Sequence, residues 1–368
     1  MKKIIIAPDS FKETMSNIEV SNIIYKTLKE KYPLYEYKLL PIADGGEGSL
    51  ETILSCGGVI NEVVSTTANF EKDVVEYLIY NDSLVIEVAQ NVGFKYKKEF
   101  SNPGNTTTYG IGEVIKAGLE KGYKKAYVCL GGTITNDGGC GLASAMGIKF
   151  YDKEDKEFIP TGDTLINIAH IDKTNFIEKY SDIEVIGLCD VTNPLHGKMG
   201  ASYIFAKQKG ASDSQIESLD KGLRHLEEIV KKDLGVDEAN TEGSGAAGGL
   251  GYCLLAFLNG KLQKGIDTIL DLIEFDKELT NDTVVITGEG KLDHQSINGK
   301  VISGIRNRLL GKNIEMIVVA GLVDGDKEFF KNYGINQVIE TNEERLDFEI
   351  VKKECRKQLA KSLDKISL

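Results

Sequence analysis

Five short apolar segments of this chain each end in an acidic residue set among small or turn-forming residues. Each segment has the length and composition of a buried strand. The acidic residues are Asp9, Asp44, Asp190, Glu289 and Asp324. Ligands of open α/β sheets bind beyond the carboxyl ends of the strands, so these side chains are expected to converge there. Gathered carboxylates suit a hard cation such as Mg²⁺, proton transfer, or both.

Asp190 is the acid whose surroundings suggest a specific role. It ends the segment at 185–189 and precedes Asn193 and Pro194. Its carboxylate could accept a proton from a substrate hydroxyl, which is the task of a general base in phosphoryl transfer. The alternative is a turn residue that accepts hydrogen bonds from its own backbone.

Two glycine-rich segments could bind anions. Residues 131–139 (GGTITNDGG) stand between a predicted strand and a predicted helix, where backbone N–H groups and hydroxyls can bind phosphate, and an ordinary turn is equally compatible. Residues 243–251 contain G-x-G-x-x-G, but no strand precedes them, so we exclude a Rossmann dinucleotide site. A phosphate contact and close helix packing both stay open for this tract.

Lysines near these loops could neutralise a transferring phosphoryl group, although any one of them is more commonly a solvated side chain. They are Lys12, Lys207, Lys209, Lys291 and Lys300. The sequence contains neither the P-loop motif nor the H-R-D and D-F-G motifs of protein kinases. Any nucleotide site is therefore of another kind.

The elements that must position these residues follow two patterns. A capping box at Ser16–Glu19 begins a helix between strands at 4–6 and 36–43, which predicts a right-handed β-α-β unit, and this pattern returns after residue 284. Closely spaced antiparallel strands are predicted from about residue 61. We predict an α/β protein in which residues 1–58 and 275–368 form an outer, doubly wound (Rossmann- or flavodoxin-like) parallel-sheet domain. Residues 59–274 form an inserted mixed α/β domain, with the active site in the cleft between them.

Composition limits the class of protein. The 368 residues suffice for two domains, and a net charge of −12 opposes binding to nucleic acid or to anionic membranes. No apolar stretch approaches the ~18 residues of a membrane span, and the apolar run after Met1 is too short for a signal peptide, which predicts a cytoplasmic protein. Six cysteines without a CxxC pair indicate reduced, buried thiols and no zinc site.

Taken in order, seven segments closely resemble the type 1 glycerate kinases. They are 7–13, 43–48, 131–139, 189–195, 208–211, 245–251, and 287–290 with 293–296 and 299–300. The resemblance is collinear from residue 4 to about 325. It departs from the family at Thr133-Ile134, where Ser-Ala is frequent, and at Ala206-Lys207, where Gly-Pro is common; neither change threatens the activity.

The resemblance implies an ATP-dependent kinase that phosphorylates D-glycerate to 2-phosphoglycerate or 3-phosphoglycerate, with ATP as donor and Mg²⁺ as cofactor. Its partners would be small molecules, and a homodimer is left open. Asp190 would be the base, and Lys12 would assist catalysis. The metal would be bound by Asp44, Glu47, Glu289 and Asp293. Substrate and phosphates would be held by Asp9, Ser10, Gly45, Gly46, Thr133, Thr135, Asn136, Asn193, Lys209, Gly245 and Gly248. Asp324 is interpreted as a turn residue.

Two other interpretations of the acidic strand ends are kept. A Mg²⁺-dependent phosphohydrolase of small phosphorylated acids would release inorganic phosphate without an acceptor. A noncatalytic sensor that closes on a small acid would be stabilised by its ligand without turnover. Acidic strand ends are compatible with both.

Overall fold

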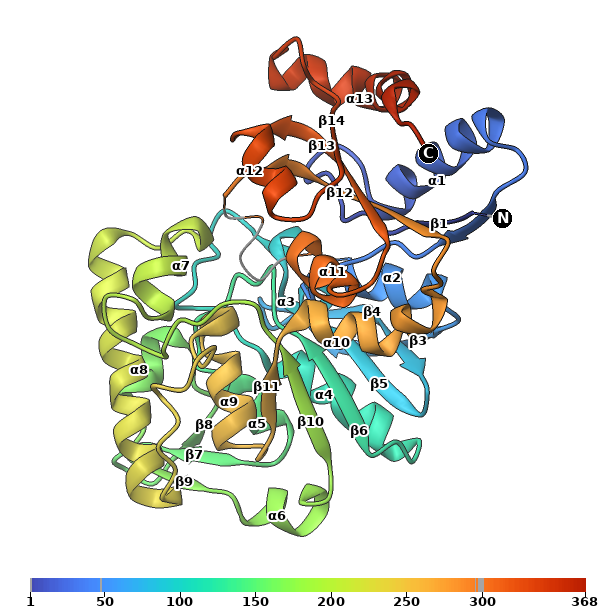
Figure 1. Ribbon diagram of the computed structural model, residues 1–368. Coiled ribbons are helices and arrows are strands. Elements are labelled where there is room, and N and C mark those ends of the chain that lie inside the picture. The colour runs from blue at the N-terminus through green and yellow to red at the C-terminus, as the bar shows by residue number, and fades with distance from the viewer. Residues whose placement is uncertain (1, 47, 295, 297–300) are drawn as a thin grey trace. The chain divides into compact units, whose positions relative to one another are not determined.

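The computed structural model describes residues 2–46, 48–294, 296 and 301–368, apart from the side chains of Ile177 and Lys327. The chain divides into two compact units (Figure 1). Unit 1 consists of Met1–Asp44, Glu51–Gly57 and Gly265–Leu368. Unit 2 consists of Gly45–Leu50 and Gly58–Lys264. Both ends of the chain thus belong to unit 1, and the middle of the chain forms unit 2.

Unit 1 is built on a parallel sheet with the strand order β14-β13-β12-β1-β2. The strands are β1 (Lys3–Ile6), β2 (Glu36–Leu39), β12 (Thr283–Leu292), β13 (Glu315–Val323) and β14 (Gln337–Glu340). From β1 the chain proceeds to β2 on one side, whereas β12, β13 and β14 follow on the other. The order therefore reverses between β1 and β12, and in doubly wound sheets such a switch point is where ligands bind. The predicted doubly wound fold is confirmed for this part of the chain.

The helices of unit 1 are α1 (Asn17–Lys31), α10 (Gly265–Leu272), α11 (Val301–Leu309), α12 (Lys327–Asn332) and α13 (Phe348–Ser362), together with most of α2 (Ser49–Ser55). The predicted capping box of α1 is present, because the Glu19 amide donates to Ser16 Oγ (3.2 Å) and the Ser16 amide donates to Glu19 Oε2 (3.1 Å). The apolar face of α1 buries Val20, Ile24 and Leu28.

Two boundaries in unit 1 differ from the sequence-based expectation. β2 ends at Leu39 rather than near residue 43, because Pro8 and Pro41 lack the N–H groups that would extend the ladder. The backbone nevertheless stays beside β1, since the Ile42 amide donates to the Pro8 carbonyl (2.9 Å). Unit 1 resumes at Gly265 and not near residue 275, because residues 265–272 form α10 and belong to unit 1. There α10 packs closely on α11: a Cβ added at Gly304 of α11 would lie 2.3 Å from the Ile266 side chain.

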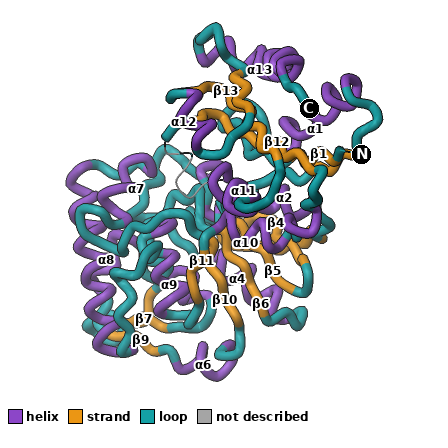
Figure 2. Tube along the Cα trace, viewed as in Figure 1, coloured by secondary structure: helices purple, strands orange, loops and turns teal. Residues whose placement is uncertain are grey.

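Unit 2 is built on a mixed sheet with the order β11-β10-β6-β5-β4-β3. Its strands are β3 (Val59–Thr66), β4 (Lys72–Tyr80), β5 (Ser83–Glu87), β6 (Lys125–Cys129), β10 (Glu184–Leu188) and β11 (Lys261–Gln263). The predicted antiparallel strands are β3, β4 and β5, and β5, β6, β10 and β11 run parallel to one another. Figure 2 shows β5, β6 and β10 side by side in orange. A small antiparallel sheet adds β7 (Lys149–Tyr151), β8 (Glu157–Phe158) and β9 (His170–Asp172).

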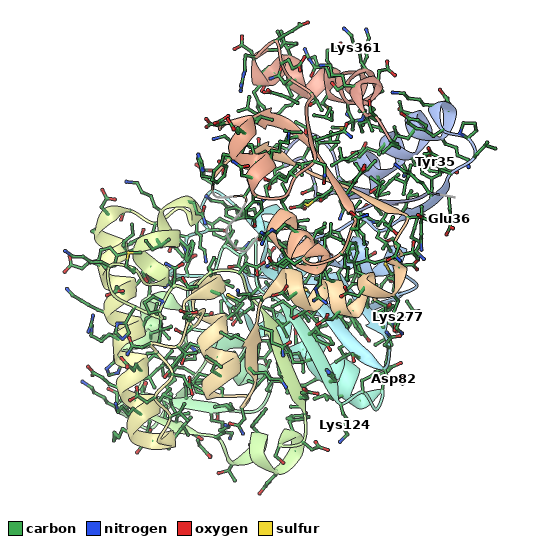
Figure 3. All side chains as sticks on the ribbon, in the orientation of Figure 1. Tyr35, Glu36, Asp82, Lys124, Lys277 and Lys361 are labelled. Carbon is green, nitrogen blue, oxygen red and sulfur yellow. The ribbon has the colours of Figure 1, made fainter. Side chains whose placement is uncertain are left out.

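Helices pack around the unit 2 sheet and bury one large apolar core. They are α3 (Ala89–Val92), α4 (Tyr109–Glu120), α5 (Cys140–Ala145), α6 (Thr174–Tyr180), α7 (Ala201–Lys209), α8 (Asp213–Leu234) and α9 (Leu250–Ala256). Charged side chains such as Lys124 point away from the body of the unit (Figure 3). Among the described residues, no helix is long and apolar enough to cross a membrane. The six cysteines, all among the described residues, are thiols that form no disulfide bond, as predicted.

Candidate active site

Three acids lie on neighbouring strands of the unit 1 sheet or after them. Asp9 follows β1 and Asp44 follows β2. Glu289 is predicted to end its strand but lies inside β12, level with Ala320, because the ladder with β13 continues to Leu292. The Asp9 amide donates to the carbonyl of Gly288 (2.8 Å), which places Asp9 against the strand that carries Glu289. Glu289 is 8% exposed. These three carboxylates are the part of the predicted acidic cluster that unit 1 brings together at its switch point.

The electrostatic state of Asp9 reflects this arrangement. Burial, with the negative charge of Asp44 as the next cause, raises the pKa of the Asp9 carboxyl to about 7. The Ser10 amide, which donates to Asp9 Oδ1 (2.6 Å), and the charge of Lys12 oppose this shift. No lysine, arginine or histidine forms an ion pair with Asp9 in the described part of the chain. A cation bound here would relieve repulsion that the fold leaves in place.

The predicted catalytic residue Lys12 is exposed, and its backbone lies beside β12, because a Cβ added at Gly290 would be 3.5 Å from the Lys12 nitrogen. Gly45 is buried with φ +85°, a conformation that favours glycine. The Gly46 carbonyl accepts from Ser49 Oγ (2.8 Å). Glu47 and Lys300 lie outside the described residues.

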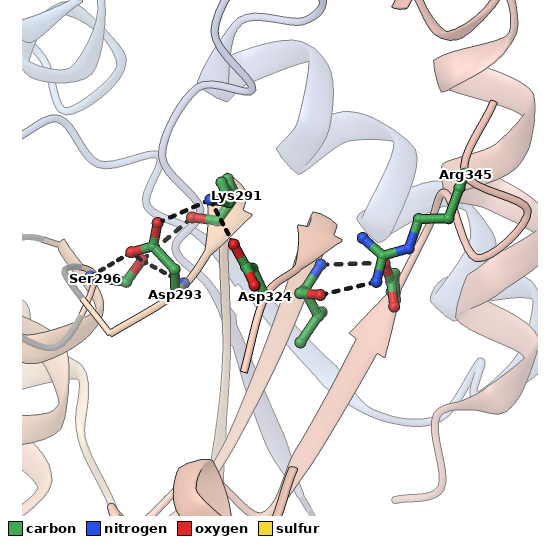
Figure 4. Close-up of polar contacts among 7 residues, drawn as sticks. Lys291, Asp293, Ser296, Asp324 and Arg345 are labelled. Carbon is green, nitrogen blue, oxygen red and sulfur yellow. Dashed lines mark hydrogen bonds and ion pairs between the residues drawn. The ribbon is translucent and has the colours of Figure 1, made fainter. Parts of the chain in front are cut away.

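Asp293, the fourth predicted metal ligand, is held in a different way (Figure 4). Lys291 Nζ lies 3.3 Å from Asp293 Oδ2 and 2.8 Å from Asp324 Oδ2, and the Ser296 amide donates to Asp293 Oδ1 (3.2 Å). Asp324 is thus an exposed partner of Lys291 as well as a residue at a strand end. At the neighbouring strand end, Arg345 forms an ion pair with Glu340 and donates a hydrogen bond to the Val323 carbonyl. Lys291 already pairs with Asp293, which makes this carboxylate less suited to bind a metal than Asp44 or Glu289.

Among the described acids of the predicted site, Asp9, Asp44 and Glu289 are the ones that could each contribute a carboxylate to a magnesium ion. Among the described residues, no group of three or more His, Cys, Asp or Glu side chains could hold a metal ion on its own. Mg²⁺ is commonly bound by one or two carboxylates, with waters and substrate phosphate oxygens completing its shell. The donor set of unit 1 fits that mode and does not resemble a closed protein cage.

In unit 2, Asp190 follows β10 at the carboxyl edge of the sheet. The Leu130 amide donates to the Leu188 carbonyl (3.0 Å), so the segment after β6 starts beside the segment that carries Asp190. Asn193 is held by two bonds of its own: its Nδ2 donates to the Met199 carbonyl (2.7 Å), and its carbonyl accepts from the Gly245 amide (2.9 Å). Asn193 thus shapes the loop after Asp190.

The loop at 131–139 is buried from Thr133 onward. Thr135 Oγ1 and Asn136 Oδ1 are buried atoms without a hydrogen-bond partner among the described residues, while Asn136 Nδ2 donates to Ser202 Oγ (3.1 Å). Asp137, by contrast, accepts from the Thr108 amide and hydroxyl (2.8 Å each) and from the amides of Gly139 and Gly141. Asp137 therefore stabilises the loop and the start of α5, whereas Thr135 and Asn136 keep bonding capacity for a ligand.

Lys209 is the cation that unit 2 places on this loop. It ends α7, is only 3% exposed, and donates to the Thr135 carbonyl (2.7 Å) and to Thr133 Oγ1 (3.2 Å). No carboxylate forms an ion pair with it in the described part of the chain. Burial lowers the pKa of Lys209 to about 7, and the negative charge of Asp137 opposes this shift.

The second glycine tract connects these loops by close packing. A Cβ added at Gly245 would lie 2.2 Å from the Pro194 carbonyl oxygen, and one added at Gly248 would lie 2.1 Å from that of Thr135. The Gly248 carbonyl also accepts from the Gly138 amide (3.1 Å). Of the two interpretations of this tract, the structure supports close packing directly.

Glu87 is a residue that the sequence-based site does not include. It ends β5, is 2% exposed, and its Oε2 accepts from the amides of Gly48 (3.1 Å) and Leu50 (3.2 Å). In the sequence Glu87 follows the apolar residues 84–86 but precedes Val88 instead of a turn-forming residue, so the pattern of the five opening segments does not mark it. Its burial and its two backbone partners are visible only in the folded chain.

The chain was compared with known proteins. The family model described as "Glycerate kinase family" matches residues 4–367. Glycerate 2-kinase of Escherichia coli (strain K12) is 38% identical over 340 residues, or 91% of this chain and 89% of the relative. Glycerate kinase of Bacillus subtilis (strain 168) is 36% identical over 340 residues, or 91% of this chain and 88% of the relative.

A solved structure matches as well. The crystal structure of a protein assigned as glycerate kinase 2 from Salmonella typhimurium LT2 has a TM-score of 0.85 and is 34% identical, covering 98% of this chain and 96% of that one. The family resemblance noted in the sequence is thereby confirmed. This chain belongs to the glycerate kinase family and is an ATP-dependent kinase, a transferase that phosphorylates a hydroxyl group.

Proposed function

We propose that this chain transfers the γ-phosphate of ATP to the 2-hydroxyl of D-glycerate and produces 2-phosphoglycerate. The relatives named above are glycerate kinases, and the name of the E. coli relative specifies the 2-position. The observation that carries the proposal is the polar set on the 131–139 loop. Lys209 provides a buried cation there, and Thr135 Oγ1 and Asn136 Oδ1 have no hydrogen-bond partner among the described residues. One cation beside two hydrogen-bonding groups matches a small hydroxy acid.

In this proposal the Lys209 amino group binds the glycerate carboxylate. Two of its three N–H bonds have acceptors in Thr133 and Thr135, and no further acceptor is present among the described residues, so the third is available to an anion. A carboxylate beside Lys209 would also favour the charged form of the amine. Thr135 and Asn136 would bond to the hydroxyl groups and orient the acid.

Asp190 acts as the general base. Its carboxylate takes the proton of the attacking hydroxyl while the hydroxyl oxygen forms a bond to the γ-phosphorus. The bond from that phosphorus to the β,γ-bridging oxygen breaks, and ADP leaves with the electron pair. Asn193 and Gly245 hold the loop that follows Asp190 and so maintain its position.

Residues after β1 and β2, together with Glu289 of β12, provide the groups for the phosphates. Asp9, Asp44 and Glu289 would hold Mg²⁺ together with phosphate oxygens, and the ion would supply charge neutralisation on the transferring group. Ser10, Lys12 and the amides of Gly45 and Gly46 would contact the remaining phosphate oxygens. Lys12 is exposed and is placed beside Asp9 by the chain itself.

The proposal is tested by incubating the purified chain with ATP, Mg²⁺ and D-glycerate and following the products by phosphorus NMR. We expect 2-phosphoglycerate and ADP in equal amounts, and no phosphate release when glycerate is omitted. Formation of 3-phosphoglycerate would contradict the proposed position. Release of inorganic phosphate without glycerate would support the phosphohydrolase, and thermal stabilisation by glycerate without turnover would support the sensor.

A further inference from the structure

Glu87 lies at the edge of the unit 2 sheet where Asp190 also lies. In the register of the parallel strands, Glu87 of β5 and Leu188 of β10 are both level with Cys129 of β6. Asp190 follows Leu188 by two residues. Two strand spacings, or about 10 Å, therefore separate Glu87 from the strand that leads to the proposed base.

The carboxylate of Glu87 binds backbone and is thereby linked to another part of the chain. Its Oε2 accepts from the amides of Gly48 and Leu50 at 3.1 and 3.2 Å. These amides stand at the start of α2, where helix N–H groups have no partner within the helix and where negative charge is favoured. Glu87 supplies both the acceptor and the charge for this helix start.

The segment that Glu87 holds is the one that follows Asp44. Residues 45–50 count with unit 2, contain Gly45 and Gly46 of the proposed phosphate contacts, and take positive φ at Gly45 (+85°) and Gly48 (+91°). Gly45, Gly46 and Gly48 belong to no strand, so no sheet ladder fixes their backbone. The carboxylate of Glu87 fixes the amides of Gly48 and Leu50, which follow Gly45 and Gly46 closely in the chain.

Retaining an acid here is costly for the fold. A carboxylate that is 2% exposed loses its hydration, and its bonds to the two amides offset part of that cost. An apolar side chain would leave both amides without this acceptor. The acid therefore fixes the backbone at this point of the chain, which comes directly after Gly45 and Gly46.

We propose that Glu87 is a positioning residue that seats residues 45–50 at the carboxyl edge of the unit 2 sheet, so that the Gly45 and Gly46 amides can bind the phosphate of the nucleotide. This inference rests on the proposed function for its account of what the amides bind. Glu87 itself contacts no reacting atom and acts through the segment that it holds.

The first test measures position without using activity. Amide hydrogen exchange is followed for residues 45–50 in the wild type, in Glu87→Gln and in Glu87→Ala, with and without ATP and Mg²⁺. Asp233→Asn is the matched control, because the Asp233 side chain is only 14% exposed and also accepts from a backbone amide (Ile171, 2.9 Å), which here belongs to β9 of the small sheet. We expect exchange at 45–50 to be at least about tenfold faster in both Glu87 variants, protection by ATP to be lost, and neither change in the control.

The second test measures kcat and KM for ATP and D-glycerate. Misplacement of binding amides by about 1 Å can cost about 10²-fold, so we expect kcat/KM for ATP to fall 10- to 100-fold in Glu87→Gln, with partial rescue in Glu87→Asp. A purely structural cap would lower the melting temperature and the folded fraction but leave the KM for ATP of the folded enzyme unchanged.

The two tests separate the inference from the proposed function. If the wild type makes no phosphoglycerate, the proposed function fails, and the exchange experiment alone decides on Glu87. Unchanged exchange at 45–50 in both Glu87 variants, or an unchanged KM for ATP beside normal turnover, would overturn the positioning role. If Glu87→Ala does not fold, Glu87→Gln provides the same readouts.

Discussion

The two units place opposite charges in comparable situations. In unit 1, burial and a neighbouring acid raise the pKa of the Asp9 carboxyl to about 7. In unit 2, burial lowers the pKa of the Lys209 amine to about 7. Neither side chain forms an ion pair among the described residues. One unit therefore keeps a buried acid that a cation would stabilise, and the other keeps a buried base that an anion would stabilise.

Asp137 shows that burial by itself does not mark such a group. It is fully buried, yet four N–H or O–H donors from Thr108, Gly139 and Gly141 satisfy it. Its charge is used to hold a loop, and nothing is left for a ligand. The difference from Asp9 and Lys209 is the number of partners, which is a property of the fold and not of the residue type.

The largest effect is expected for the acid of unit 2. Replacing Asp190 with Asn removes the proposed base without changing its size, and we expect kcat to fall by roughly 10²- to 10⁴-fold. Steady-state kinetics with ATP and D-glycerate measure it. Asp182→Asn is the matched control, because Asp182 precedes the same strand at its opposite end and is 63% exposed.

Near-normal kcat in Asp190→Asn with a raised KM would contradict the role of base. Asp190 would then contribute to substrate binding and not to proton transfer. A fall in the Asp182 variant as large as that in Asp190→Asn would show a general effect on unit 2.

The next effect concerns the buried amine. Lys209→Met keeps an unbranched side chain one atom shorter and removes the charge, so the glycerate carboxylate loses a charge-assisted hydrogen bond worth about 1.5–3 kcal/mol. The KM for D-glycerate should therefore rise about 10- to 100-fold. Lys207→Met is the control, since Lys207 is 75% exposed on the same helix. An unchanged KM for D-glycerate in the Lys209 variant would exclude the proposed carboxylate contact.

The pH dependence of stability should be opposite in the two units. Between about pH 4 and 7 the folded chain retains the Asp9 proton that the unfolded chain releases, so this group's contribution to stability falls as pH rises. Between about pH 7 and 10 the unfolded chain retains the Lys209 proton that the folded chain releases, so this group's contribution rises with pH.

Asp9→Asn should therefore gain stability relative to the wild type on going from pH 4 to pH 7, and Lys209→Met should lose relative stability on going from pH 7 to pH 10. Each change should be on the order of 1–3 kcal/mol. Urea unfolding at three pH values measures both. If the stability of both variants relative to the wild type changed with pH in the same direction, the assignment of opposite charges to the two regions would be wrong.

Much of this fold could be predicted because its signals are local. Ser16 and Glu19 are three residues apart and predict the start of α1. The apolar segments before Asp9 and Asp190 have the length of strands. Parallel strands with helical crossovers then place the strand ends at one edge of each sheet. The family resemblance added the reaction, which no local pattern specifies.

The remainder depends on contacts between distant residues. Glu87 meets Gly48 and Leu50, which lie 39 and 37 residues away, and Lys209 meets Thr133 and Thr135, which lie 76 and 74 residues away. The burial of Lys209 and the satisfaction of Asp137 follow from how α7 and the loop at 131–139 pack. The ion pairs of Lys291 with Asp293 and with Asp324 are likewise visible only in the folded chain.

The smallest effect is expected for Asp324, the acid at a strand end that resembles Asp9 in sequence but not in surroundings. Asp324 is 67% exposed and lies 2.8 Å from Lys291, whose hydrogen bond and charge hold its pKa below the usual value. An exposed pair of this kind is screened by water and contributes little. We expect Asp324→Asn to keep kcat within about twofold and to leave the melting temperature unchanged at pH 7. Steady-state kinetics and differential scanning fluorimetry measure this, with Asp9→Asn run beside it. A tenfold loss of kcat in the Asp324 variant would mean that Asp324 positions Lys291 and Asp293 for the reaction. Burial would then no longer distinguish the acids that contribute to catalysis from the acids that only end a strand.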